Sequence, residues 1–215
     1  MRLFLDTADV SAIESRFTTG LISGITTNPT LIKKSGKNPQ DVYKELKEFG
    51  IEDISMEIVG DTEEELFSRA IAHSKTYEST ATIKLPCSIA GLRACKRLSA
   101  MNIRTNVTLV FSVSQAVLSA LAGATYVSPF VGRLDDNSIN GLDLIKDIAK
   151  VYDKHYAEAD TQILAASIRD VKSVGKAFEY GADICTIPPS VFDNMYNHIL
   201  TDKGITQFNK DNAET

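Results

Sequence analysis

The chain has 215 residues, enough for one domain with a substantial hydrophobic core. Its net charge of −5 argues against nucleic acid or an anionic membrane surface as the main partner. Three cysteines without a C-x-x-C pair predict neither a disulfide framework nor a zinc knuckle. The first apolar stretch ends at Asp6, and no apolar run is long enough for a membrane span, so we expect a cytoplasmic protein.

Short apolar segments alternate with longer amphipathic segments along almost the whole chain. The expected strands are residues 2–6, 24–27, 54–59, 80–85, 104–110, 125–128, 162–166 and 183–187. The expected helices are residues 10–17, 39–49, 62–77, 89–100, 114–121, 141–155, 170–180 and 189–197. Eight strand–helix units predict the α/β class and a single closed (α/β)8 TIM barrel over residues 1–200, because an open sheet rarely contains so many units.

A further amphipathic segment follows the eighth unit. Thr201 can cap a helix that carries Ile205 and Phe208 on one side. A closed barrel does not need this ninth helix. Residues 201–215 are therefore expected to form a C-terminal helix and tail, either within the same domain or docked on a neighbouring subunit, and the pattern itself slightly favours a helix across the barrel's own end.

Lys84 stands at the end of a strand-like run, with apolar neighbours on both sides. Apolar surroundings disfavour the ammonium form, and an uncharged amine can attack a carbonyl to form a Schiff base. The alternative is a strand-end lysine that reaches solvent or pairs with a carboxylate. The other strand ends decide between these interpretations.

Polar residues also follow the other predicted strands, at the end of a barrel where the chemistry of this fold is found. Two acids can exchange protons, two amides can bind substrate hydroxyls, and two arginines can hold a phosphate. These residues are Asp6, Glu57, Asn28, Asn106, Arg133 and Arg169. Singly, each has another explanation: Asp6 as a helix cap, Asn28 as part of a turn, Arg133 in an exposed ion pair. Together they predict one site and favour the Schiff-base interpretation of Lys84.

Other chemistries find no support in the sequence. The three histidines are far apart on predicted helices, so we predict no metal site and no Ser–His pair. Neither of the common glycine-rich phosphate loops is present. The basic residues 33–37 are expected to form a solvated loop after the second strand.

Several motifs resemble those of the transaldolase family in its short, single-barrel form. They are residues 4–8 (FLDTA), 24–30 (GITTNPT), 83–86 (IKLP), 105–109 (TNVTL), 123–133 (GATYVSPFVGR) and 165–169 (AASIR). The resemblance spans nearly the whole chain. It implies a cofactor-independent enzyme of the pentose phosphate pathway. That enzyme transfers a dihydroxyacetone unit from fructose 6-phosphate or sedoheptulose 7-phosphate to erythrose 4-phosphate or glyceraldehyde 3-phosphate.

The resemblance also implies roles for individual residues. Lys84 would attack the ketose carbonyl, and Asp6 would take the proton of the hydroxyl whose loss cleaves the carbon–carbon bond. Glu57 would act through a water held by Thr108. The residues implied to hold the dihydroxyacetone part are Asn28, Asn106 and Ser128. Those implied to hold the phosphate are Arg133, Ser167 and Arg169.

Two alternatives to a transaldolase remain open. Fructose-6-phosphate aldolase, a relative that releases free dihydroxyacetone, has glutamine in place of Glu57 and tyrosine in place of Phe130, so both positions here are transaldolase-like. A non-catalytic sugar-phosphate-binding barrel is expected to lack Lys84 or both acids, and all three are present.

The resemblance also bears on assembly. Short members of the family form rings of five that pair into ten subunits, with the C-terminal helix packed on a neighbour. A homo-oligomer, pentamer or decamer, is therefore implied. This implication reverses the preference for the tail, and residues 201–212 become an expected interface element.

Overall fold

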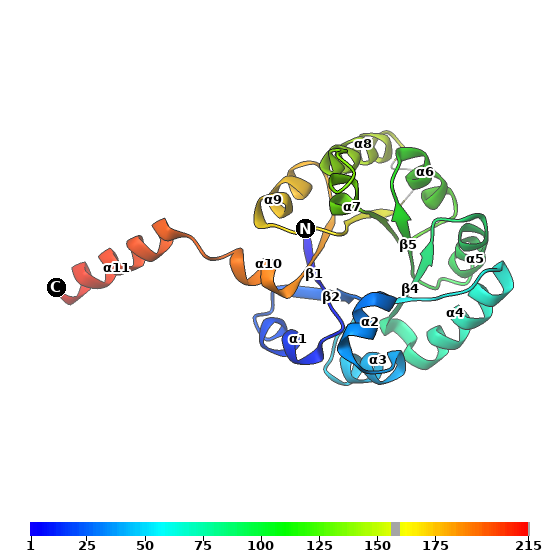
Figure 1. The fold of residues 1–215 in the computed structure, drawn as a ribbon, viewed down its shortest axis with the longest axis horizontal. Helices are drawn as coiled ribbons and strands as arrows, with labels where there is room; N and C mark the ends of the chain where they lie inside the picture. The colour runs from blue at the N-terminus through cyan, green and yellow to red at the C-terminus, as the bar shows by residue number, and fades with distance from the viewer. Residues whose placement is uncertain (156–159, 215) are drawn as a thin grey trace.

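The structure is a computed structural model that describes residues 1–155 and 160–214. Its parallel strands form one closed barrel in chain order, with the first strand paired to both the second and the eighth (Figure 1). The strands are β1 (Arg2–Asp6), β2 (Ile22–Thr26), β3 (Ile54–Glu57), β4 (Ala81–Pro86), β5 (Thr105–Val110), β6 (Tyr126–Pro129), β7 (Gln162–Ala165) and β8 (Ile184–Ile187). The predicted (α/β)8 barrel is confirmed.

Helices connect successive strands around the barrel, and two more follow the last strand. They are α1 (Val10–Phe17), α2 (Pro29–Ser35), α3 (Pro39–Glu48), α4 (Glu63–Tyr77), α5 (Ile89–Ser99), α6 (Val113–Leu121), α7 (Val131–Asp135), α8 (Gly141–Lys154), α9 (Val171–Glu179), α10 (Pro189–Asn194) and α11 (Ile199–Ala213), with a 3-10 turn, η1 (Glu78–Thr80). Each predicted helix has a counterpart within a few residues of its expected bounds. The short helices α2 and α7 were not predicted.

Helix α2 corrects the expected loop over residues 33–37. Asn28 Oδ1 accepts a hydrogen bond from the Leu31 N–H, and Pro29 occupies the first turn, so this helix starts with a complete N-cap. It ends at Gly36, whose φ of 72° is left-handed. Lys33 and Lys34 therefore lie on the last turn of a helix, where their charge complements the helix dipole.

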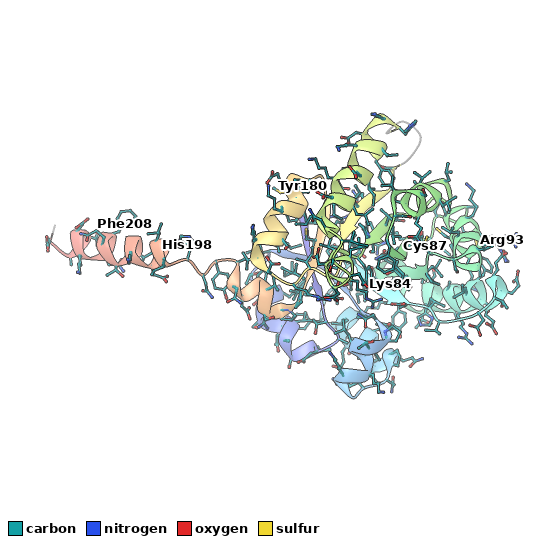
Figure 2. The ribbon with its side chains drawn as sticks, turned by 45° about the horizontal axis from the view of Figure 1, so that its top comes forward. Lys84, Cys87, Arg93, Tyr180, His198 and Phe208 are labelled. Atoms are coloured by element: carbon teal, nitrogen blue, oxygen red, sulfur yellow. The ribbon has the colours of Figure 1, made fainter. Side chains whose placement is uncertain are left out.

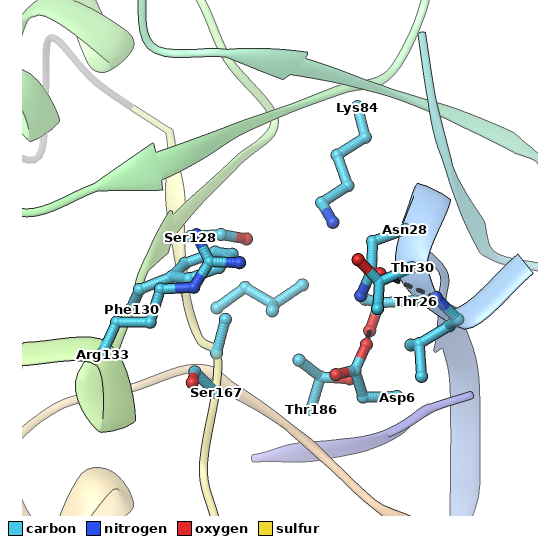
Figure 3. A pocket seen from close by; sticks show the side chains of 13 residues that line it. Asp6, Thr26, Asn28, Thr30, Lys84, Ser128, Phe130, Arg133, Ser167 and Thr186 are labelled. Atoms are coloured by element: carbon cyan, nitrogen blue, oxygen red, sulfur yellow. Dashed lines mark hydrogen bonds between the residues drawn. The ribbon is translucent and has the colours of Figure 1, made fainter. Parts of the chain in front are cut away.

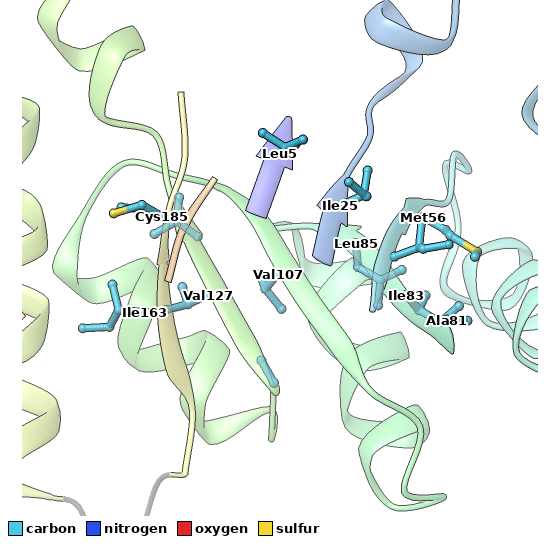
Figure 4. Close-up of a cluster of buried hydrophobic side chains, with 14 of the residues drawn as sticks. Leu5, Ile25, Met56, Ala81, Ile83, Leu85, Val107, Val127, Ile163 and Cys185 are labelled. Carbon is cyan, nitrogen blue, oxygen red and sulfur yellow. The ribbon is translucent and has the colours of Figure 1, made fainter. Parts of the chain in front are cut away.

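The strands alternate between two faces, and this alternation places the polar residues inside the barrel. Ile83 and Leu85 belong to the main cluster of buried apolar side chains, between the barrel and its helices (Figure 4). Lys84, between them, must point to the other face, into the barrel. Asp6 follows Leu5 and Asn106 precedes Val107 in the same way. The outward apolar residues therefore determine which polar residues meet in the interior.

A cluster of apolar side chains and a polar network fill much of the barrel interior. Phe4, Tyr126, Leu164, Ala166 and Ile184 form a small interior cluster. At the N-terminal ends of the strands, the buried Asp53 accepts hydrogen bonds from the side chains of Thr82, Tyr126 and Arg104. The interior is thus packed at this end.

Helix α11 extends away from the barrel (Figure 1). Figure 2 shows His198 and Phe208 on this projection, well apart from Lys84. None of its residues is buried, and the Phe208 side chain is 73% exposed. A helix across the barrel's own end, which the pattern alone favoured, is therefore wrong for this structure. No helix in the described part of the chain is long and apolar enough to cross a membrane.

Candidate active site

A cavity of about 200 Å³ opens at the C-terminal ends of the strands (Figure 3). The predicted site residues that line it are Asp6, Asn28, Lys84, Ser128, Phe130, Arg133 and Ser167. The predicted site residues that do not line it are Glu57, Asn106, Thr108 and Arg169. The strand ends thus converge on one cavity, as the barrel topology requires.

Lys84 is held inside the barrel by two oxygen acceptors. Its side chain is 6% exposed, and Nζ lies 3.0 Å from Glu57 Oε2. Nζ also donates a hydrogen bond of 3.0 Å to the backbone oxygen of Thr27. The alternative of a lysine that reaches solvent is therefore wrong, and the carboxylate that pairs with Lys84 is itself one of the two predicted acids. The amine is fixed at the cavity wall beside a proton acceptor.

The strand register sets Glu57, Lys84 and Asn106 side by side. Glu57 of β3 is the register partner of Lys84 in β4, and Lys84 is the partner of Asn106 in β5. Neighbouring strands lie about 5 Å apart. Three polar residues on adjacent strands therefore reach the interior at one level of the barrel.

Asp6 is a buried carboxyl that lines the same cavity. Burial raises its pKa, and the charge of Glu57 also raises it, whereas the charge of Lys84 and a hydrogen bond from Thr26 Oγ1 to Oδ1 act in the opposite direction. That bond is 2.8 Å long. A carboxyl with a raised pKa suits proton exchange. Asp6 is not the cap of α1, because Asp9 accepts the Ser11 and Ala12 N–H groups there.

A hydrogen-bonded chain connects Ser55, Asn106 and Ser128 behind the cavity wall. Ser128 Oγ donates to Asn106 Oδ1 at 2.7 Å, and Asn106 Nδ2 donates to Ser55 Oγ at 3.1 Å. All three side chains are buried. Asn106 therefore orients Ser128, which lines the cavity, and is not itself part of the wall.

Thr108 is buried two residues beyond Asn106 on the same strand. Its Oγ1 has no hydrogen-bond partner. Among the buried side-chain nitrogen and oxygen atoms of residues 1–155 and 160–214, it is the one atom of which this is true. Buried polar groups are almost always partnered by protein or by ordered water. The hydroxyl is therefore suited to hold a water in the wall of the site.

The two arginines lie in different surroundings. Arg133, on α7, lines the cavity and has its guanidinium 4.8 Å from the centre of the Phe130 ring. Arg169 forms a two-pronged ion pair with Asp136 and is 54% exposed. It does not line the cavity. The expected phosphate clamp of Arg133 and Arg169 is therefore only half assembled in this conformation.

The loop that carries Ser167 is locked to α7. Ser167 has a left-handed backbone with φ of 61°, which is uncommon for a residue other than glycine. The Gly132 N–H donates to its carbonyl oxygen at 3.1 Å. A Cβ on Gly132 would lie 2.3 Å from that oxygen, so only glycine permits this approach. The contact sets the two predicted phosphate-binding segments side by side.

Sequence reasoning missed three threonines that line the cavity: Thr30 on α2, and the strand residues Thr26 and Thr186. The last two stand at strand ends, and Thr186 lies between the outward-facing Cys185 and Ile187. The alternation of the eighth strand was a sufficient signal for an inward hydroxyl. No group of three or more His, Cys, Asp or Glu side chains in the described residues could hold a metal ion.

One known protein family matches almost the whole of this chain. A profile described as Transaldolase/Fructose-6-phosphate aldolase matches residues 3–215. The chain belongs to this family. Proteins called probable transaldolase from Paracoccus denitrificans and Caulobacter vibrioides are each 46% identical to it, over 100% of this chain and 98% of their own length. One from Symbiobacterium thermophilum is 46% identical over 98% of this chain and 96% of its own.

A solved structure of thiamine phosphate pyrophosphorylase from Pyrococcus furiosus is similar in fold. It superposes with a TM-score of 0.57 over 86% of this chain and 85% of its own, at 14% identity. This similarity concerns the barrel alone. The family match and the full-length relatives, in contrast, confirm the resemblance seen in the motifs and support an enzyme of the transaldolase type.

Proposed function

We propose that this enzyme is a transaldolase that carries a dihydroxyacetone unit on Lys84 as a Schiff base. Its donors are fructose 6-phosphate or sedoheptulose 7-phosphate, and its acceptors erythrose 4-phosphate or glyceraldehyde 3-phosphate, as in the pentose phosphate pathway. The observation that carries the proposal is a buried lysine at a cavity wall, 3.0 Å from Glu57, in a cavity that Asp6 also lines.

The first step is attack of the Lys84 amine on the ketose carbonyl. Glu57 accepts a proton from the ammonium, so that Nζ can form the carbon–nitrogen bond. The resulting carbinolamine loses its hydroxyl as water when that oxygen is protonated. A water bound to the Thr108 hydroxyl can carry this proton from Glu57, and it supplies the hydrolytic water of the last step.

The second step is cleavage of the carbon–carbon bond. Asp6 takes the proton of the C4 hydroxyl, the electrons of the C3–C4 bond move toward the protonated imine, and the aldose phosphate leaves. The enamine then attacks the aldehyde of the acceptor, whose oxygen receives the proton held by Asp6. Asp6 therefore acts as a base in one half-reaction and as an acid in the other.

Substrate binding uses the rest of the cavity. Asn28 accepts the Leu31 N–H through Oδ1, which leaves its Nδ2 to bind a hydroxyl of the dihydroxyacetone part, beside Ser128. Arg133 binds the phosphate at the rim. Arg169 joins it by exchanging the carboxylate of Asp136 for the phosphate, since both anions accept the same pair of guanidinium hydrogen bonds.

Transfer is favoured over release of free dihydroxyacetone by Phe130. After cleavage the bound unit is an enamine, which must gain a proton before it can be hydrolysed. A phenylalanine ring at the cavity wall has no hydroxyl proton to give, so the unit persists until an acceptor arrives. The acid Glu57 is also transaldolase-like. The second candidate function is that of fructose-6-phosphate aldolase, which has other residues in place of Glu57 and Phe130.

The test supplies fructose 6-phosphate with and without erythrose 4-phosphate and follows glyceraldehyde 3-phosphate. Release beyond one equivalent per site should require the acceptor. Equal turnover without the acceptor would overturn the proposal in favour of the aldolase. A matched control is the Arg133→Met variant, in which the KM for the phosphorylated donor should rise while the dependence on an acceptor is retained.

A further inference from the structure

Two threonine hydroxyls from different strands form a hydrogen-bonded chain that ends at the carboxyl of Asp6, on a third strand. Thr26 of β2 is the register partner of Asp6 in β1, and Thr186 of β8 is the partner of Phe4, two residues earlier. The two threonine oxygens are 2.6 Å apart, and Thr26 Oγ1 lies 2.8 Å from Asp6 Oδ1 (Figure 3). Both threonines are 2% exposed. Side chains from the two strands that flank β1 thus contact each other beside the carboxyl of its last residue.

The direction of this chain follows from the number of protons. Each hydroxyl has one hydrogen to donate. When Asp6 is ionised, Thr26 must give its hydrogen to the carboxylate, so in the contact between the threonines Thr26 accepts and Thr186 donates. When Asp6 carries a proton on Oδ1, the same contacts can run the other way, from Asp6 to Thr26 and from Thr26 to Thr186.

We propose that Thr186 is a positioning residue for Asp6, acting through Thr26. It fixes the carboxyl in one orientation and lets the chain of hydrogen bonds reverse as Asp6 gains and loses its proton, with no movement of heavy atoms. The inference rests on the proposed function, in which Asp6 is first a base and then an acid. A single rigid donor would serve only the ionised form.

The hydroxyl chain is separate from the charged groups that act on Asp6. Those groups are Lys84 on β4 and Glu57 on β3. Thr26 and Thr186 come from the two strands paired with β1 and carry no charge. Removal of the Thr186 hydroxyl therefore changes the hydrogen bonding of Asp6 and leaves the Lys84–Glu57 pair in place.

The experiment compares Thr186→Val, which keeps the shape of the side chain, with Thr186→Ser, which keeps the hydroxyl. Thr105→Val is the matched control, because Thr105 is equally buried but contacts Cys95 in the outer layer. For Thr186→Val we expect a roughly tenfold lower rate of transfer, the upper end of the cost of losing one hydrogen bond between neutral groups. The acid limb of its kcat/KM profile should move to higher pH, because the ionised form of Asp6 has lost support.

Borohydride trapping with dihydroxyacetone separates this inference from the proposed function. Dihydroxyacetone has no C3–C4 bond to cleave, so its adduct reports Lys84 alone. We expect Thr186→Val to trap it as the unchanged enzyme does, and Thr186→Ser to restore the transfer rate and the pH profile. The inference would be overturned if Thr186→Val matched Thr105→Val in transfer rate and pH profile. It would also be overturned if Thr186→Ser were as impaired as Thr186→Val. Absence of an adduct in the unchanged enzyme would instead overturn the proposed function.

If Thr186→Val does not fold, Thr186→Ala takes its place in the same assays. The alanine variant leaves more space but removes the same hydrogen, so the pH shift and the intact trapping are expected again. An alanine variant with an unshifted acid limb contradicts the role of Thr186.

Discussion

Glu57 and Lys84 share a largely buried ion pair, with side chains 17% and 6% exposed. A Glu57→Gln variant keeps the size and a hydrogen-bonding oxygen but cannot accept a proton. Imine formation should therefore slow by about 10²-fold, the usual contribution of a general base. Rapid-quench trapping with borohydride measures this rate, and Glu52→Gln, an exposed acid, is the control. An unchanged rate would remove Glu57 from the mechanism.

The buried carboxyl of Asp6 is expected to lower the stability of the fold at neutral pH. Burial raises the pKa of Asp6 above its ordinary value of 3.8, so the folded chain binds this proton more tightly than the unfolded chain does. The associated stability is present below pH 3.8 and is lost as the pH rises through the raised value. At neutral pH, ionised Asp6 therefore destabilises the fold.

An Asp6→Asn variant should thus lose transfer activity and become more stable than the unchanged enzyme at pH 7. Its advantage should shrink as the pH approaches 3.8, where the unchanged carboxyl is protonated too. Urea denaturation at several pH values measures the difference. A variant that is less stable at neutral pH would show that the carboxylate is stabilised by its surroundings.

At the residue scale, the sequence allowed us to predict which residues point into the barrel, but not which side chains they would contact. Lys84 stands between two outward apolar residues and Asn106 precedes one, Val107, so their direction follows from strand alternation. The pairing of Arg169 with Asp136 could not be foreseen, because it depends on the path of two loops. The Thr26–Thr186 contact was missed because threonine is common in strands for reasons other than function.

The polar network at the N-terminal ends of β3 to β6 gives a prediction at the scale of elements. Asp53 is 2% exposed and accepts hydrogen bonds from Thr82, Tyr126 and Arg104. Asp53→Ala leaves buried donors without a partner, so the free energy of unfolding should fall by about 3–5 kcal/mol. Because this end of the barrel faces away from Lys84, kcat per folded molecule should not change.

Chemical denaturation and active-site titration test the two halves of this prediction. The control is Asp147→Ala, which removes an exposed ion pair with Lys150 and should cost less than about 1 kcal/mol. Equal losses of stability in both variants would mean that the network does not hold the strands together. A fall in kcat for Asp53→Ala would connect the two ends of the barrel.

Among the helices, the long ones were predictable, whereas two short ones, α2 and α7, were missed. Helices such as α4 and α8 have several turns with an apolar face, and α4 starts with a capping box between Thr62 and Glu65. Helices α2 and α7 have 7 and 5 residues, too few to show a period. Both follow strand ends that line the cavity, so the segments that lacked a pattern are those that shape the site.

At the scale of the molecule, α11 displays apolar side chains with no cover from its own barrel. Ile199, Leu200, Ile205 and Phe208 are each more than half exposed. We expect this helix to pack on a neighbouring subunit, since an isolated amphipathic helix of 15 residues is only marginally stable in water. A chain that ends at Asn197 should therefore sediment as smaller species and keep its barrel.

Sedimentation velocity and circular dichroism measure these two properties. The Ile205→Ser, Phe208→Ser double variant keeps the full length and should disperse the assembly as well. A full-length protein that already sediments as a monomer, or a truncated one with an unchanged sedimentation profile, would contradict the interface.

The barrel as a whole was the most predictable feature, because eight repeats of one pattern leave few topologies. The position of the last helix could not be predicted. An apolar face indicates that a helix packs against another surface, but it does not identify that surface. The motifs supplied the family, which the full-length matches confirm. The pattern by itself placed α11 on the wrong surface, across its own barrel.

The most direct test of the central claim is to incubate the enzyme with fructose 6-phosphate, reduce with borohydride and locate the adduct by peptide mass spectrometry. We predict a reduced dihydroxyacetone adduct on Lys84, and none in Lys84→Met, whose apolar side chain of similar length suits the buried site. An adduct on another lysine, or transfer activity retained by Lys84→Met, would contradict the account.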